Sequence, residues 1–447
     1  MRKHLAHLVR KDLTFFLSLL FLTVIPLFPE YCAPVLAIGS LCAAVKDAHN
    51  RQTTVKLGTL GKSILLFILY QLFTAIYSQH VGNTLSTVAM WSVMFCGYLA
   101  LTTTVHNQQR LHTVFLFIGT VAGIVGLISC SQYVLRNIFA QKLPNQIWYT
   151  LDKKLYAIFP MNIDLHLGFD RSAATFNNPN ILAEYLIMVI PFVGYSGFTG
   201  PRTKQSLFMR GCTVLAVLGA VISFSRGSYI ALLSMLLLIL ALNFKHLTPF
   251  VLCLVAAVSL IPEAVTSRFL SIGATTADHA ITERFDVWNV AVQTIIERPL
   301  FGLGAGISNF WECLQNTNIN APHSHNLILQ MLVEGGFIML FLMCIVFTKF
   351  LQNGLELTDC HNRGRSLGVT LTMFIIAFAV HGMVDYPFLS PKLVGAFLMV
   401  IGIADAVSPL YLYSSSPMVS FIRYPATLFQ SVRQRFKSRK KSPQADP

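Results

Sequence analysis

The chain has 447 residues, of which 54% are apolar and only 12% are charged, and its formal net charge is +14. Its mean hydropathy is +0.61. Because about a quarter of the residues in a soluble globular protein are charged, this composition excludes a soluble enzyme, a secreted disulfide-rich domain and a disordered chain. Apolar runs long enough to cross a bilayer recur along the whole sequence. They predict an all-α, polytopic membrane helix bundle.

About twelve of these runs are expected to cross the membrane as helices. They lie near residues 13–28, 31–45, 63–79, 84–104, 111–131, 180–198, 207–223, 228–244, 247–262, 324–348, 367–384 and 393–411. An even number of crossings places both ends of the chain on the same side. Most lysine and arginine residues fall on the side of the N-terminus, and basic residues favour the cytoplasmic side. The sequence therefore predicts an N-in, C-in orientation.

These crossings divide the chain into six regions. They are the N-terminal spans 1–131, an outer segment 132–179, the middle spans 180–262, a large outer loop 263–323 with an amphipathic helix, the C-terminal spans 324–411 and a basic cytoplasmic tail 412–447. The basic tail suits anionic lipid of the inner leaflet. Because no nucleic-acid-binding fold is visible, membrane lipids are the expected partners and nucleic acid is not.

The first polar cluster joins Arg171 to the run Asn178-Pro179-Asn180, at the start of the span 180–198. Asparagine followed by proline is typical of a helix start. A helix N-terminus also presents free N–H groups to an anion. The cluster therefore indicates either an anion site or a plain helix cap.

The second cluster is Ser225-Arg226-Gly227, in a tight outer turn between two very apolar spans. An arginine at this depth needs a partner or access to water. Guanidinium is suited to bidentate contact with phosphate. Binding of a phosphate ligand and contact with lipid phosphate both remain open for Arg226.

The third cluster contains Arg284 and Trp288 in a segment that ends at Pro299. Apolar residues repeat at helical spacing, which predicts an amphipathic helix: Phe285, Trp288, Val292, Ile295 and Ile296. Trp288 would suit the membrane interface. The glycine-rich run 302–306 follows, and it indicates either an ordinary turn or a loop that brings backbone close to a ligand.

The fourth cluster is His323 and His325-Asn326 at the outer mouth of the span 324–348, with Glu334 further along. A histidine can accept the proton of a hydroxyl group near neutral pH. A structural polar contact is the alternative. The chain has no CxxC pair and no zinc-type Cys/His spacing, so neither a metal nor any other cofactor is expected. Together the arginines and a histidine predict transfer from a lipid-pyrophosphate donor.

In this order, the motifs resemble the O-antigen ligase and O-antigen polymerase superfamily of bacterial membrane glycosyltransferases. The matching residues are Arg171, Thr175-Phe176, Asn178-Pro179-Asn180, Ala183, Ser225-Arg226-Gly227, Arg284-Phe285, Trp288, Ala291, Pro299, Gly302-Leu303-Gly304, His325-Asn326, Leu329 and Glu334-Gly335. The resemblance covers residues 171–345. The first 130 residues match only as hydrophobic spans.

The resemblance implies a GT-C-like, metal-independent enzyme of the bacterial inner membrane, with its active site on the outer face. It implies that Arg226 and Arg284 bind the pyrophosphate of an undecaprenyl-pyrophosphate-linked glycan, and that His325 activates the acceptor hydroxyl. Arg171 is expected at the donor site, and His323 is a second, less closely matched catalytic candidate. Supporting roles are expected for Asn178, Asn180, Asn326, Glu334 and Trp288. A single in-line displacement would invert the anomeric carbon.

Three activities share these motifs: ligation to lipid A–core, polymerisation of repeat units and O-glycosylation of exported proteins. The single motif-bearing outer loop and the short tail favour the ligase. A transporter of lipid-linked sugars is the alternative from another class. The intramembrane carboxylates are few (Glu184, Glu334 and Asp405), and no related halves are visible, which disfavours a transporter.

Overall fold

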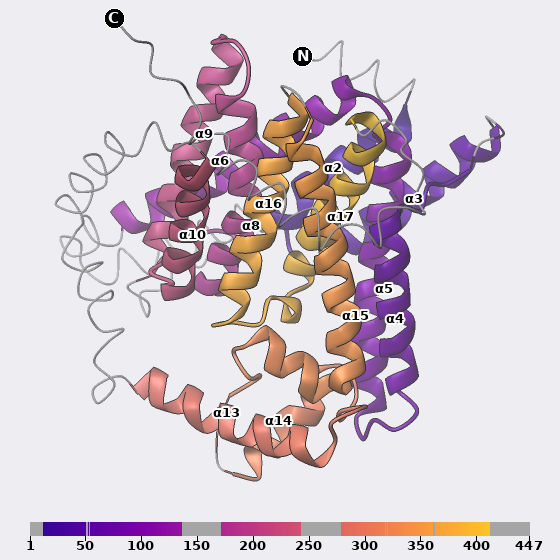
Figure 1. The fold of residues 1–447 in the computed structure, drawn as a ribbon, viewed down its shortest axis with the longest axis vertical. Helices are drawn as coiled ribbons and strands as arrows, with labels where there is room; N and C mark the ends of the chain where they lie inside the picture. The colour runs from indigo at the N-terminus through magenta and orange to yellow at the C-terminus, as the bar shows by residue number, and fades with distance from the viewer. Residues whose placement is uncertain are drawn as a thin grey trace, which may run out of the picture.

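The computed structural model describes residues 12–50, 52, 54–135, 171–242, 279–317, 319, 321–360 and 363–411. Over these residues the regular structure is helical throughout, as the sequence predicts (Figure 1). The expected span 247–262, most of the outer segment 132–179, the first part of the loop 263–323 and the tail 412–447 lie outside the described residues.

The N-terminal helices are α2 (Leu13–Leu27), α3 (Cys32–Asn50), α4 (Thr59–Thr74), α5 (Val81–Thr104) and α6 (Gln108–Val134). The middle helices are α8 (Pro179–Phe198), α9 (Lys204–Ile222) and α10 (Arg226–Leu242). The C-terminal part contains α13 (His279–Glu297), α14 (Ile307–Gln315), α15 (Leu327–Thr358), α16 (Arg363–Gly382), the short 3₁₀ turn η4 (Pro387–Leu389) and α17 (Pro391–Tyr411).

Seven of the described helices are long and apolar enough to cross a membrane: α5, α6, α8, α9, α15, α16 and α17. The apolar helices α2, α4 and α10 are shorter. The prediction of a polytopic helical membrane protein is thereby confirmed, whereas the number of crossings and the orientation stay predictions. The expected span 31–45 is a helix, α3, but Lys46, Asp47 and His49 near its end leave it less apolar than the seven.

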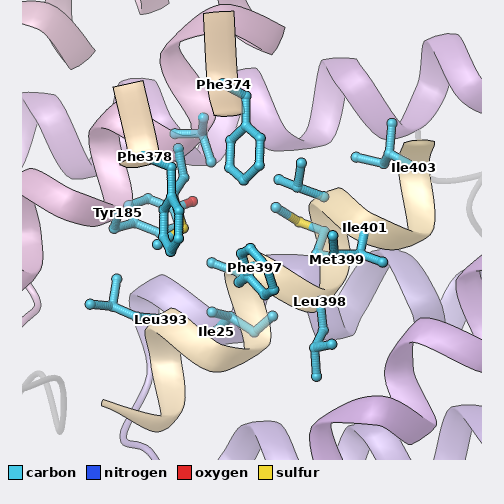
Figure 2. Packing of buried hydrophobic residues seen from close by; sticks show 14 of the residues in the cluster. Ile25, Tyr185, Phe374, Phe378, Leu393, Phe397, Leu398, Met399, Ile401 and Ile403 are labelled. Carbon is cyan, nitrogen blue, oxygen red and sulfur yellow. The ribbon is translucent and has the colours of Figure 1, made fainter. Parts of the chain in front are cut away.

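The helix α17 lies within the bundle, with nearly every side chain from Lys392 to Val407 buried. Figure 2 shows its Phe397 beside Phe374 and Phe378 of α16. The rings of Phe378 and Phe397 are stacked 5.1 Å apart, and those of Phe374 and Phe378 are 5.7 Å apart. Because lipid is as apolar as these side chains, close packing rather than exclusion of water holds such helices together.

The glycines of α6 allow a close contact between two helices. Gly119 and Gly123 are four residues apart, and Gly126 follows one turn later, all toward α9. A Cβ at Gly126 would lie 2.3 Å from the carbonyl oxygen of Leu215. Small residues at this spacing let two membrane helices approach to backbone contact.

The glycine-rich run after Pro299 packs against a break in α15. Gly336 has a φ of +64°, and the N–H of the next residue, Phe337, donates to Pro299 O at 2.8 Å. Leu303 N–H donates to Val333 O, also at 2.8 Å. The glycine-rich run therefore lies close to the backbone of α15. The run attaches α13 and α14 to one end of the bundle, at the bottom of Figure 1.

Two of the intramembrane carboxylates have partners of their own. Asp405 accepts hydrogen bonds from Tyr98 Oη at 2.7 Å and Gly61 N–H at 2.9 Å, so it joins α17 to α4 and α5. Glu334 accepts from Gln330 Nε2 at 2.8 Å and from Gly306 N–H at 3.0 Å. Both are structural contacts, because they satisfy backbone and side-chain donors inside the bundle.

Candidate active site

Three arginines from separate parts of the sequence line one pocket. Arg171 precedes α8, Arg226 begins α10 and Arg284 lies on α13, with Asn180 of α8 beside them. The pocket has a volume of about 100 Å³ and is open to solvent. Three guanidinium groups around one opening favour an anionic ligand with several oxygen atoms.

Hydrogen bonds hold the first two motifs together. Arg171 donates through Nε to Ser223 O at 2.8 Å and through Nη2 to Asn180 Oδ1. Asn178 caps α8, because its Oδ1 accepts from Asn180 N–H at 2.7 Å. Arg171 therefore fixes the segment before α8 against the turn that leads into α10.

Left-handed backbone marks the motif segments. Ala174, Phe224 and His325 have φ values of +48°, +51° and +50°. Such a conformation costs a side-chain-bearing residue of order 1–3 kcal/mol, and it persists where surrounding structure imposes it, often at functional sites. Each of these three residues lies in a different motif.

The segment 323–326, here called the histidine segment, is fixed to the start of α15, which follows it in the chain. Asn326 caps that helix: its Oδ1 accepts from Ile328 N–H at 2.9 Å and Leu329 N–H at 3.0 Å. The same side chain donates through Nδ2 to Met383 O at 2.9 Å. Asn326 therefore joins the histidine segment to the chain that follows α16.

Ser324 lies between the two histidines, and both its N–H and its carbonyl group form hydrogen bonds. Its N–H donates to Gln330 Oε1 at 2.9 Å, and its carbonyl accepts from Trp288 Nε1 at 2.8 Å. Gln330 in turn contacts Glu334. Trp288 and Glu334 thus both hold the histidine segment in place, and this contact gives Trp288 a partner within the protein in addition to the membrane-interface position expected from its sequence.

His325 pairs with Asp385, which lies between α16 and η4. His325 Nδ1 is 3.2 Å from Asp385 Oδ1, and Tyr386 N–H donates to the same oxygen at 2.9 Å. Burial by itself would raise the pKa of Asp385, but the hydrogen bond from His325 and the charges of nearby histidines hold that pKa well below its usual range. A permanently ionised carboxylate at Nδ1 keeps the proton on that nitrogen, so Nε2 of His325 is the atom that can act as a base.

His323 carries its ring proton on a different nitrogen from His325. Its Nδ1 accepts from His325 N–H at 3.1 Å, and the two rings lie 4.1 Å apart. Burial, together with the nearby positive charges of His325 and Arg284, lowers the pKa of His323 to about 4. His323 is therefore neutral near pH 7, with its proton on Nε2, and that nitrogen is a hydrogen-bond donor rather than a base.

His323, His325 and Asp385 also have the ligand types of a divalent transition-metal site, and one ligand atom of each lies within 4.8 Å of the others. Both Nδ1 atoms are already engaged: that of His325 by Asp385 and that of His323 by a backbone N–H. A metal at Nδ1 would displace these hydrogen bonds. The arrangement therefore fits a histidine–carboxylate dyad, and the absence of a metal stays a prediction.

Residues 211–344 match the family model described as O-antigen ligase. Residues 211–344 therefore carry an O-antigen ligase family domain. A comparison with curated proteins found no match. A match to the O-antigen ligase family implies a membrane glycosyltransferase-like enzyme that uses a lipid-linked glycan. The matched region runs from α9 into α15, so it contains Arg226, Arg284, His325 and Glu334.

Two residues of the pocket were not singled out from the sequence: His381 near the end of α16 and Asp385 just after it. Both lie beyond the region matched by the O-antigen ligase model. A histidine and an aspartate four residues apart, at the end of an apolar span, are a sequence feature that could have marked them as candidate site residues. What the sequence did not contain was the position of Asp385 beside His325, 60 residues earlier.

Proposed function

We propose that this protein is an O-antigen ligase of the bacterial inner membrane. In this proposal a GT-C-like enzyme transfers glycan from undecaprenyl pyrophosphate to a sugar hydroxyl of lipid A–core on the outer face. The observation that supports it best is the contact of His325 with Asp385, at the edge of a pocket lined by three arginines. A base and an anion site are the two parts that such a transfer needs.

The proposed reaction is a single displacement. Nε2 of His325 accepts the proton of the acceptor hydroxyl, whose oxygen attacks the anomeric carbon of the glycan. The bond from that carbon to the pyrophosphate oxygen breaks, and its electron pair leaves with the pyrophosphate. Attack opposite the leaving group inverts the anomeric carbon.

Each arginine has a place in this reaction. Arg226 and Arg284 would contact the pyrophosphate directly, where the planar guanidinium matches two phosphate oxygens. Arg171 already bonds to Ser223 O and Asn180, so it would add charge while holding the pocket together. With the leaving charge met by arginines, the reaction needs no metal ion.

The polymerase differs only in its acceptor, a sugar hydroxyl of a second lipid-linked repeat unit. A transfer assay with purified protein and undecaprenyl-pyrophosphate-linked glycan separates the alternatives. Lipid A–core is supplied in one reaction and omitted from another, and EDTA is added to a third.

We expect product only where lipid A–core is present, and the same yield with EDTA. Longer lipid-linked chains without lipid A–core would identify a polymerase. Loss of activity with EDTA that a divalent ion restores would contradict metal independence. No turnover with either acceptor would reject both activities, and protein acceptors and then transport would be tested next.

A further inference from the structure

A second histidine–carboxylate pair lies inside the bundle, next to the same pocket. His381 of α16 is only 2% exposed, and its Nδ1 is 3.0 Å from Oε1 of Glu184 on α8. This is an ion-pair distance, but the two atoms are not aligned for a hydrogen bond, and neither ring nitrogen of His381 has a hydrogen-bond partner among the described residues. The mechanism above does not use either residue.

The ring of His381 forms part of the pocket wall that also contains Arg226 and Gly227. A Cβ at Gly227 would lie 2.9 Å from His381 Nε2 and 2.6 Å from Val384 Cγ2. The absence of a side chain at Gly227 therefore lets the start of α10 approach the Nε2 edge of the ring. Nδ1 of His381 therefore faces Glu184, and Nε2 lies beside Gly227, which also lines the pocket.

A buried ionisable pair with unused donors is costly in a membrane protein. Ionisable residues at this depth pair with one another or mark a ligand pathway. An N–H at Nε2 of His381 would be such an unused donor, without an acceptor among the described residues. A buried donor without a partner costs of order 1–3 kcal/mol, and an anionic ligand in the pocket would supply the acceptor that the protein does not.

We infer that His381, paired with Glu184, is a further binding residue for the donor pyrophosphate, donating from Nε2 to a phosphate oxygen. The other charged groups that line this pocket are Arg171, Arg226, Arg284 and Asp385. His381 differs from the arginines because it lies against the carboxyl group of Glu184, which does not itself line the pocket. The inference rests on the proposed function in one respect: it assigns the pocket to the pyrophosphate of the lipid donor.

The test measures binding separately from turnover. The dissociation constant of undecaprenyl pyrophosphate is measured on the full chain in nanodiscs for wild type, His381→Gln and Glu184→Gln. The matched control is His80→Gln, because His80 forms an exposed pair with Glu312 at 2.8 Å, away from the pocket. Thermal unfolding and the KM for the acceptor are measured on the same preparations.

We expect the dissociation constant to rise about tenfold or more in His381→Gln and in Glu184→Gln, with the acceptor KM and the His80→Gln variant unchanged. A dissociation constant within about twofold of wild type in a folded His381→Gln protein would overturn the inference. If His381→Gln does not fold, Glu184→Gln decides by the same criterion. Binding that depends on His381 in a protein that transfers no glycan would support the inference and reject the proposed function.

Discussion

His325 and His323 are two residues apart, yet the hydrogen bonds around them prepare the two rings for different roles. Asp385 fixes the proton of His325 on Nδ1, so Nε2 can accept a proton. The N–H of His325 fixes the proton of His323 on Nε2, so that ring can only donate. The proposed base is therefore His325, and the difference comes from single contacts rather than from residue type.

Asp385→Asn tests that difference. An amide can donate to Nδ1 and thereby shift the proton to Nε2, so transfer should fall by about 10²–10⁴-fold, the usual contribution of a general base. The rate of glycan transfer is compared with that of Asp286→Asn, which changes an exposed aspartate on α13. A rate for Asp385→Asn close to wild type would remove the dyad from the mechanism.

Arg284→Lys tests bidentate recognition of phosphate. Lysine keeps the charge but loses the planar pair of donors, so the donor KM should rise by about tenfold, the loss of one charge-assisted hydrogen bond. Steady-state kinetics over a donor series measure it. Arg298→Lys is the control, because Arg298 is exposed just after α13, and equal behaviour of the two variants would argue against the assignment.

His323→Asn tests the buried neutral histidine. The pKa of His323 is about 4 in the folded protein and 6.5 ordinarily, so between these values the unfolded chain binds a proton that the folded chain does not. Stability therefore falls as the pH falls through that window, by up to about 3 kcal/mol. Asparagine keeps an acceptor for His325 N–H but does not titrate.

The melting temperature of His323→Asn should accordingly change less than that of wild type between pH 6.5 and pH 4. Asp385 is present in both proteins, and its lowered pKa keeps it ionised in the folded state across the window. Parallel melting curves for the two proteins would show that His323 is not the titrating group.

At the scale of the elements, the break in α15 places α13 and therefore Arg284. The backbone of residues 299–304 pairs with residues 333–337 through three hydrogen bonds. Gly336 makes this possible: its φ is +64°, and a Cβ there would lie 2.3 Å from Leu300 O. A continuous helix would leave the glycine-rich run without these partners.

Gly336→Ala should therefore destabilise the protein by about 2 kcal/mol or more, from the left-handed backbone and the lost space together. Thermal unfolding in detergent measures the loss. Gly194→Ala in α8 is the matched control, because nothing lies within 4 Å of its Cβ position, and there alanine favours the helix. Equal melting temperatures for the two variants would contradict this account of the break.

At the scale of the whole molecule, the helices α13 and α14 lie at one end of the bundle (Figure 1), and Arg284 of α13 lines the candidate site. Arg202 lies in the loop between α8 and α9, and Lys204 begins α9, which leads back to the pocket at Arg226. The distribution of basic residues predicts that the loop is cytoplasmic and the site end is outside.

Single cysteines test this orientation in a chain whose native cysteines have been replaced. Asn316→Cys, exposed just after α14, should react with a membrane-impermeant thiol reagent in intact spheroplasts. Lys204→Cys, exposed at the start of α9, should react only after permeabilisation. The opposite pattern of labelling would reverse the orientation and place the site in the cytoplasm.

The sequence by itself determined the class of the protein and most of its helices. Apolar length is a local property, so the helices from α2 to α17 that overlap expected spans follow from it. Local chemistry likewise predicted the cap at Asn178 and the amphipathic helix α13. The resemblance that named the family also came from short motifs in a fixed order, and the family match agrees with it.

Only the tertiary structure decided which polar groups meet. The pairing of His325 with Asp385 spans 60 residues, and that of Glu184 with His381 joins α8 to α16. No periodicity in the sequence encodes such contacts, because they depend on how separate helices pack and on where glycines such as Gly227 and Gly336 allow close approach. The position of the ring proton also depends on tertiary contacts. His323 and His325 belong to one motif, but they carry the proton on different ring nitrogens because different groups contact them.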